Sequence, residues 1–239
     1  MGPTDDSLAQ LEDDAHSILR GLPSDHAPIV VEFAGSPKAG KSTTIDILQH
    51  FFKRMGFKVW APSEGAGKRT PYHLKRDLVA FNTWTLNYAI SELLVAYYNV
   101  DHHNLIILDR GLHDSLAWMG LLHKRQDQNL DEREFAVFKD YAVHTRWVSL
   151  ISRLYLFTCS VKDSLHREHD AKLTRRTGTA MNEEMLGALL REYEQLGSAW
   201  QEPYKVHTSA KTTPLGTSYE LAVDILGLLR SRLPRQDGN

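Results

Sequence analysis

The sequence predicts an α/β fold in which a parallel sheet is covered by helices on both faces, giving three layers. From residue 28 onward, short continuous apolar runs alternate with longer amphipathic segments. Apolar runs of strand length are typical of parallel strands buried on both sides, and the amphipathic segments supply the covering helices. The chain has 239 residues, enough for one large domain of this kind.

The elements can be assigned in order along the chain. The strands are expected at residues 29–34, 58–62, 105–109, 154–159 and, more weakly, 204–209. The helices are expected near residues 42–55, 77–99, 112–125, 131–148, 181–197 and 217–231. We predict a domain at 28–232 and a flexible tail at 233–239. Residues 1–27 form an N-terminal extension in which Leu8, Leu11, Ala15, Ile18 and Leu19 recur at helical spacing, so an amphipathic helix is favoured over a flexible arm.

Composition excludes several classes of protein. The formal net charge is −2, so the chain as a whole offers no basic field for nucleic acid, although a local basic cluster remains compatible with it. The one cysteine, Cys159, excludes an internal disulfide framework and suits a reducing cytoplasm. No apolar stretch approaches the roughly 18 residues of a membrane span, and no signal-peptide pattern opens the sequence. We therefore expect a cytoplasmic protein.

A phosphate-binding loop follows the first strand directly. Residues 35–42, GSPKAGKS, match the G-x-x-x-x-G-K-[ST] pattern between a strand and a helix, the context that this motif requires. Gly35 and Gly40 permit the tight turn, and Lys38, Ala39 and Thr43 complete a cradle of backbone amides at the helix start. Lys41 would reach the β- and γ-phosphates of ATP, and the Ser42 hydroxyl would bind Mg²⁺. The motif predicts a P-loop NTPase-type fold with ATP and Mg²⁺ as cofactors.

Charged residues follow the other strands at the edge of the sheet where the P-loop lies. Ligands of open α/β sheets bind at the carboxyl ends of the strands. The expected strands are followed there by Glu64, Lys68 and Arg69, by Asp109 and Arg110, and by Arg167, Lys172, Arg175 and Arg176. Acids that handle metal or protons and guanidinium groups that neutralise phosphate charge are the components of a phosphoryl-transfer site. We expect Asp109 to hold Mg²⁺ directly or through water, and Arg110 to face an oxygen or phosphate of the acceptor. An Asp109–Arg110 ion pair that only caps the following helix is the structural alternative.

These motifs together resemble the thymidylate kinase and deoxyribonucleoside kinase group. The resemblance rests on AGSPKAGKSTT, on SEG after the second strand, on LDRGLHDSLAWMG after the third, and on the Arg-rich segment, and it covers roughly residues 28–230. It implies a five-stranded parallel sheet, an Arg-rich lid, and transfer of the ATP γ-phosphoryl to a nucleoside or nucleoside monophosphate. Such kinases are often homodimers, which makes a homodimer possible here by analogy.

The resemblance also implies roles for single residues. Glu64 matches the base that acts on the acceptor hydroxyl, with Asp109 as the alternative base, and Arg110 matches the arginine that follows this acid. Arg167 matches a lid arginine that lies against adenine, and Arg175 and Arg176 match those that contact phosphates. Lys38 stands where some thymidylate kinases place a catalytic arginine. Gly111 stands in place of a tyrosine that crowds the sugar, and Pro37 in place of an acid, which favours a wider or different acceptor pocket.

The segment 77–100 occupies the position of the helix beside the acceptor in this group. Phe81, Trp84 and Tyr88 recur at helical spacing, with Asn82 and Asn87 nearby. An aromatic face and an amide together suit a planar base, so we expect acceptor contact by Arg69, Phe81, Trp84 or Asn87; core packing of an aromatic stripe is the alternative.

Other interpretations of the sequence remain open. Glu32 in the first strand is expected to be held by a neighbouring basic side chain. His113 and Asp114 fit a polar pocket lining and a solvated helix face equally well. The acceptor could be another small molecule or a polynucleotide, and a regulatory ATPase that transfers nothing is the alternative from a different class.

Overall fold

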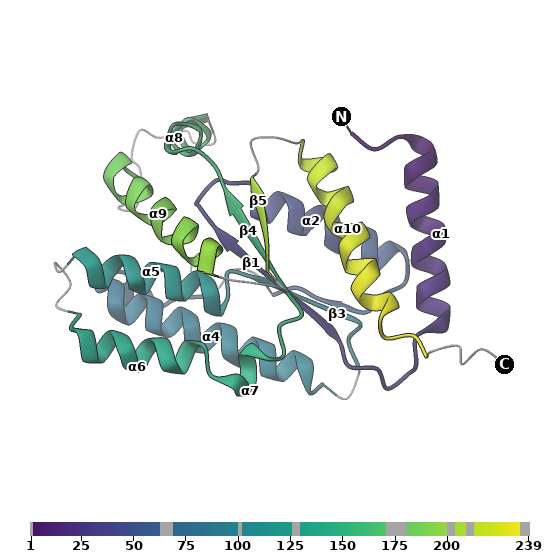
Figure 1. Cartoon of the computed structure of the whole chain (residues 1–239), viewed down its shortest axis with the longest axis horizontal. Coiled ribbons are helices and arrows are strands. Elements are labelled where there is room, and N and C mark those ends of the chain that lie inside the picture. The colour runs from purple at the N-terminus through teal and green to yellow at the C-terminus, as the bar shows by residue number, and fades with distance from the viewer. Residues whose placement is uncertain are drawn as a thin grey trace.

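The computed structural model describes residues 2–62, 69–99, 102–125, 130–170, 181–199, 204–208 and 213–234. Within these residues the predicted three-layer α/β architecture with a parallel sheet is confirmed (Figure 1). Glu64, Lys68, Lys172, Arg175 and Arg176 lie outside the described residues, as does most of the expected tail.

The sheet has the strand order β2-β3-β1-β4-β5, and every neighbouring pair is parallel. The strands are β1 (Ile29–Gly35), β2 (Val59–Trp60), β3 (Leu105–Asp109), β4 (Arg153–Thr158) and β5 (Tyr204–Thr208). Four of them are well developed, whereas β2 contributes only two residues at the edge. The P-loop strand β1 is central, so β3 and β4 flank the loop that leaves its carboxyl end.

Alternate residues of β1 divide the core between the two faces of the sheet. Val31 and Phe33 pack with α1 (Asp5–Gly21), α2 (Lys41–Arg54) and α10 (Pro214–Arg230). Val30 and Ala34 face α4 (Leu78–Tyr97), α5 (Leu112–Arg125), α6 (Glu132–Ala142) and α9 (Glu183–Ala199). Figure 1 shows these two helical layers on opposite sides of the strands.

The predicted amphipathic helix in the N-terminal extension is present as α1. The Thr4 side chain caps its first turn, and Leu11, Ala15 and Ile18 are buried. Asp14 forms an ion pair of 3.3 Å with Arg230 of α10, so the helix packs on the outside of the α2/α10 layer.

The single helix predicted at 131–148 is wrong: α6 ends at Ala142, and a short helix α7 (Thr145–Val148) follows. His144 caps α7, and the Trp147 indole N–H bonds to the carbonyl of Tyr141 at 2.9 Å. These side-chain contacts satisfy the groups freed by the break, which periodicity alone does not reveal.

Two further short helices lie outside the main layers: η1 (Tyr72–Arg76), which precedes α4, and α8 (Val161–Asp170), which follows β4. At the start of α8, Ser160 accepts a hydrogen bond from the Asp163 amide and caps the helix. Within the described part of the chain, we find no helix both long enough and apolar enough to cross a lipid bilayer.

Candidate functional site

A cavity of about 640 Å³ lies at the carboxyl ends of β1, β3 and β4. Its lining consists of the P-loop with the first turn of α2, the last residue of β3 and the residue after it, one residue each from β4 and α8, and the start of α10. These residues are Pro37, Lys38, Ala39, Gly40, Lys41, Ser42, Thr43, Thr44, Asp109, Arg110, Phe157, Arg167, Pro214 and Thr217. The fold therefore brings together most of the predicted phosphate-binding residues that the structure describes.

Two glycines give the P-loop its shape. Gly35 has a φ of 130°, and a Cβ atom there would lie 1.9 Å from the carbonyl oxygen of Phe157 on β4. Gly40 has a φ of 97° and immediately precedes the first turn of α2. Both positions adopt backbone conformations that other residues rarely tolerate, which explains the glycines of the motif.

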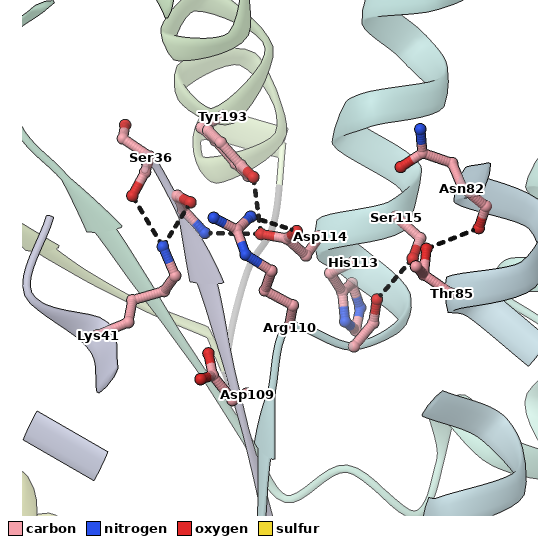
Figure 2. A network of polar contacts seen from close by, with 12 residues as sticks. Ser36, Lys41, Asn82, Thr85, Asp109, Arg110, His113, Asp114, Ser115 and Tyr193 are labelled. Carbon is pink, nitrogen blue, oxygen red and sulfur yellow. Dashed lines mark hydrogen bonds and ion pairs between the residues drawn. The ribbon is translucent and has the colours of Figure 1, made fainter. Parts of the chain in front are cut away.

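Lys41 is buried at the base of the cavity, at the start of α2. Its ammonium group donates to the carbonyl oxygens of Gly35 at 2.7 Å and Ser36 at 2.8 Å (Figure 2). The positive charge is thus held beside the amides of the helix start, where the helix dipole also favours an anion. This arrangement suits the phosphates of a nucleotide.

Ser42 and Asp109 provide the oxygen atoms for a magnesium site. The Ser42 hydroxyl donates to Oδ2 of Asp109 at 3.3 Å, across the gap between α2 and the end of β3. Mg²⁺ prefers oxygen ligands and commonly takes one or two from the protein, with phosphate and water completing its shell. The residues present fit this pattern, and both line the same cavity as Lys41.

Arg110 turns from the end of β3 toward the P-loop in an unusual backbone conformation. Its φ is 59°, and its amide donates to the carbonyl of Phe33 at 2.9 Å. Its guanidinium group lies 2.7 Å from the carboxylate of Asp114. Asp114 in turn accepts from the Gly35 amide at 3.0 Å and from the Tyr193 hydroxyl at 2.7 Å (Figure 2).

The turn after β3 rests on Glu32, a fully buried acid of β1. The Glu32 carboxylate accepts from the backbone amides of His113 at 2.8 Å and Asp114 at 3.2 Å, and lies 2.8 Å from Nδ1 of His113. The expected basic partner is His113. The helix start of α5 supplies two further donors, because its first amides have no partner within the helix. His113 and Asp114 are buried, so the solvated-face alternative is wrong.

The presence of a glycine at position 111 has a structural explanation that the sequence did not reveal. A Cβ atom at this position would lie 2.7 Å from Cδ of Glu32. The glycine is thus required by the buried acid beneath it, and its presence no longer argues by itself for a wider acceptor pocket.

One face of α8 holds the outer part of the P-loop. The Ser164 hydroxyl donates to the carbonyl of Pro37, Arg167 donates to the carbonyl of Lys38 at 2.9 Å, and Glu168 pairs with the Lys38 ammonium at 2.9 Å. Lys38 has a φ of 61°, which these contacts help to maintain. Sequence patterns gave no sign of Glu168, because an acid on a short polar helix is usually exposed, whereas this one is 3% exposed.

The acceptor candidates on α4 separate into two groups. Trp84 and Tyr88 stack with ring centroids 5.4 Å apart and planes 4° apart, and both are partly buried. Burial raises the pKa of Tyr88 above its ordinary value, as does the carboxylate of Glu92, while Arg69 lowers it. Arg69 therefore lies near this stack, although its own side chain is exposed. Phe81 is partly buried on the same helix.

Of the predicted acceptor contacts, none of Arg69, Phe81, Trp84 and Asn87 lines the cavity at the P-loop. Asn87 is exposed, it donates to the carbonyl of Thr83 at 2.8 Å, and it accepts from the Tyr141 hydroxyl of α6 at 3.0 Å. Asn82, five residues earlier, is 3% exposed; its side-chain amide donates to the carbonyl of Leu78 at 2.7 Å, and its backbone carbonyl accepts from the Thr85 hydroxyl at 2.9 Å (Figure 2). The helical phase of α4 thus directs Asn82 inward and Asn87 outward, which the sequence pattern did not distinguish.

Comparison with known proteins gives similarity in structure alone. No family model matches the sequence, and no curated protein matches it. Among solved structures, the deoxyadenosine kinase from M. mycoides with bound dATP matches at a TM-score of 0.59 and 19% identity, covering 83% of this chain and 100% of that one. The structure of the same kinase with the products dCMP and dCDP matches at a TM-score of 0.60 and 20% identity, and the structure with dCTP matches at a TM-score of 0.59 and 18% identity. Each match covers 84% of this chain and 100% of the other chain. The resemblance inferred from the motifs therefore holds for the fold, and the chain has the P-loop kinase fold of these deoxyadenosine kinase structures.

Proposed function

We propose that this protein is a phosphotransferase that moves the γ-phosphoryl group of Mg·ATP to a nucleoside or a nucleoside monophosphate. The observation that carries the proposal is the convergence of Lys41, Ser42, Asp109 and Arg110 on one cavity. Lys41 and Ser42 begin α2, while Asp109 ends β3 and Arg110 follows it. Together they supply two cationic groups and the oxygen atoms for a metal ion. The shared fold with the deoxyadenosine kinase structures supports a nucleoside as the acceptor.

In the proposed reaction, an acceptor oxygen forms a bond to the γ-phosphorus while the bond between that phosphorus and the β,γ-bridging oxygen breaks. This oxygen belongs to a hydroxyl in a nucleoside and to the phosphate in a nucleoside monophosphate. ADP leaves with the electrons of the broken bond, and with a nucleoside the hydroxyl proton passes to a carboxylate. Lys41 and Arg110 neutralise charge on the transferring group, which is the main protein contribution to this chemistry. Mg²⁺ held at Ser42 and Asp109 would supply further charge neutralisation.

The carboxylate base in this proposal is Glu64. The contact between Asp109 and Ser42 supports Asp109 as a metal ligand, and a metal-bound carboxylate is a poor proton acceptor. Glu64 follows the edge strand β2 in the chain and is thereby left as the base, with Arg175 and Arg176 as further phosphate contacts and Arg167 beside the adenine.

The acceptor itself would lie between α4 and α5. Phe81 and the Trp84–Tyr88 stack offer aromatic surface on α4, and Asn82, Thr85 and Ser115 offer polar atoms nearby (Figure 2). Arg69 stands at the edge of this region. These groups could recognise a planar base by stacking and by hydrogen bonds.

A product panel tests the proposal. Purified protein is incubated with Mg·ATP and pooled nucleosides and nucleoside monophosphates, and products that gain one phosphate are identified by mass spectrometry. Lys41→Met serves as the blank. We expect one or a few acceptors to be phosphorylated by the wild type alone. Hydrolysis of ATP with no phosphorylated acceptor would contradict the proposal and favour the regulatory ATPase.

A further inference from the structure

Asp114 occupies an unusual position among the residues of the site. It lies in the first turn of α5 and is 3% exposed. Its Oδ1 atom accepts from the Gly35 amide at 3.0 Å and from the Tyr193 hydroxyl at 2.7 Å, while its Oδ2 atom lies 2.7 Å from Nη1 of Arg110 (Figure 2). One carboxylate thus joins the start of the P-loop, the turn after β3 and helix α9.

A role as an ordinary helix-start acid does not explain these contacts. Acids in a first turn usually serve the unpaired amides of their own helix. Here the amides of His113 and Asp114 are served by Glu32, from β1. The Asp114 carboxylate is directed instead to groups on three other segments of the chain.

The Arg110 side chain is the group on which this arrangement acts. Its backbone is fixed by the contact with Phe33 and has a φ of 59°, so the direction of the side chain is set by what holds the guanidinium group. Asp114 contacts it at 2.7 Å, and Arg110 lines the cavity together with Lys41. Arginine groups that stabilise phosphoryl transfer depend on placement to within a fraction of an ångström.

Tyr193 completes the arrangement from α9. It is fully buried, and burial raises its pKa well above the ordinary value, as does the neighbouring carboxylate of Asp114. Its hydroxyl therefore stays protonated and donates to Asp114. Since α9 packs on α5 and α8, the contact connects the outer helices of this face to Arg110.

We propose that Asp114 is a positioning residue of the phosphoryl-transfer site, which sets the placement of Arg110 relative to the P-loop and couples it to α9 through Tyr193. This inference rests on the proposed function, because Arg110 is taken to contact the transferring phosphoryl group.

The chain contains a matched control for this role. Asp224 of α10 accepts from Nε of Arg153 at 3.1 Å and from the Tyr155 hydroxyl at 2.8 Å, so it forms a second, partly buried Asp–Arg–Tyr group of the same composition. It does not line the cavity. Asp114→Asn and Asp224→Asn both replace a carboxylate that binds an arginine and a tyrosine, but only the first adjoins the site.

Steady-state kinetics of the two variants separate positioning from stability. We expect Asp114→Asn to lower kcat about ten- to a hundredfold with little change in the KM for ATP. Asp224→Asn should lower the melting temperature but leave the kcat of the folded protein unchanged. Equal kcat values for Asp114→Asn and Asp224→Asn would overturn the proposal.

A binding measurement tests the same point without an acceptor. Calorimetry compares the affinities for Mg·ADP and for Mg·ADP with beryllium fluoride, which mimics the γ-phosphoryl group. We expect Asp114→Asn to weaken binding of Mg·ADP with beryllium fluoride about tenfold more than binding of Mg·ADP alone, and Tyr193→Phe to have a smaller effect in the same direction. If the ratio of these two affinities equals that of the wild type in both variants, the proposal is overturned. This readout stands even if the product panel finds no acceptor, so failure of the proposed function and failure of this inference are distinguishable. If Asp114→Asn does not fold, Tyr193→Phe alone gives the answer.

Discussion

The hydroxyl of Ser42, at the start of α2, lies 3.3 Å from the carboxylate of Asp109, at the end of β3. The two residues are far apart in the chain but adjacent at the carboxyl ends of the strands, because β3 lies directly beside the P-loop strand β1. This pair defines the oxygen-rich side of the cavity, and Lys41 and Arg110 define the cationic side. Both kinds of group are required for phosphoryl transfer from a nucleotide.

Replacing Asp109 by asparagine should weaken the response to magnesium. The amide keeps its shape but loses the charge that favours Mg²⁺. We expect a higher Mg²⁺ concentration for half-maximal rate and a kcat reduced on the order of 10²-fold. Magnesium titrations of the initial rate provide the measurement, with Asp46→Asn, an exposed acid of α2, as the control. A magnesium response identical to that of the wild type would remove Asp109 from the metal site.

Replacing Lys41 by methionine should nearly abolish transfer while preserving the fold. The methionine fills a similar volume but cannot neutralise phosphate charge, so we expect a loss of on the order of 10²- to 10³-fold in kcat. Lys53→Met, at the exposed end of the same helix, should retain wild-type activity. Comparable losses in both variants would indicate damage to α2 instead of loss of a phosphate contact.

Replacing Gly111 by alanine should destabilise the protein. The new Cβ atom would lie 2.7 Å from Cδ of the fully buried Glu32, and overpacking of this kind costs about 1–3 kcal/mol. Gly227→Ala in α10 is the control, since a Cβ atom there meets nothing within 4 Å and should stabilise the helix by up to about 1 kcal/mol. Urea unfolding of both variants measures the difference. Equal stability of the two variants would show that Glu32 can move away.

Stability should fall at alkaline pH because of two buried tyrosines. Burial raises the pKa of Tyr193 and of Tyr155 above the ordinary value of 10, and the carboxylates of Asp114 and Asp224 add to the shift. In the unfolded chain these phenols lose their protons near pH 10, while the folded protein retains them to higher pH. Their contribution to the free energy of unfolding is therefore complete below about pH 10 and declines as the pH rises further.

Denaturant unfolding at several alkaline pH values measures this decline. Tyr193→Phe should reduce its slope because one of the two phenols is removed. Tyr72→Phe should not, since Tyr72 is 80% exposed. If Tyr193→Phe and the wild type show the same slope, ionisation of Tyr193 is not linked to unfolding.

The parts of this protein that follow from local rules could be predicted from sequence. The P-loop required glycines at Gly35 and Gly40 for positive φ angles, and both are found. The parallel strands followed from apolar runs buried on both faces. The predicted positions of Lys41, Ser42, Asp109 and Arg110 at one cavity followed from the rule that carboxyl ends of parallel strands meet at one edge.

The parts that depend on contacts between distant segments could not be predicted. Whether Asn82 or Asn87 points inward depends on how α4 is rotated about its axis where it packs on α5. The spacing of the aromatic residues in the sequence does not indicate this rotation. Glu168 is buried only because α8 packs on the P-loop at Lys38. Besides Arg110, the Asp114 carboxylate contacts the Gly35 amide and the Tyr193 hydroxyl, each 79 residues away in the chain.

The central claim is that this cavity transfers the γ-phosphoryl group to an acceptor. The most direct measurement follows the label from ATP labelled at the γ-phosphate when the wild type and Lys41→Met are supplied with nucleosides and nucleoside monophosphates. The account predicts that the label appears on an acceptor with the wild type and is absent with Lys41→Met. Label released only as free phosphate, or equal transfer by both proteins, would contradict it.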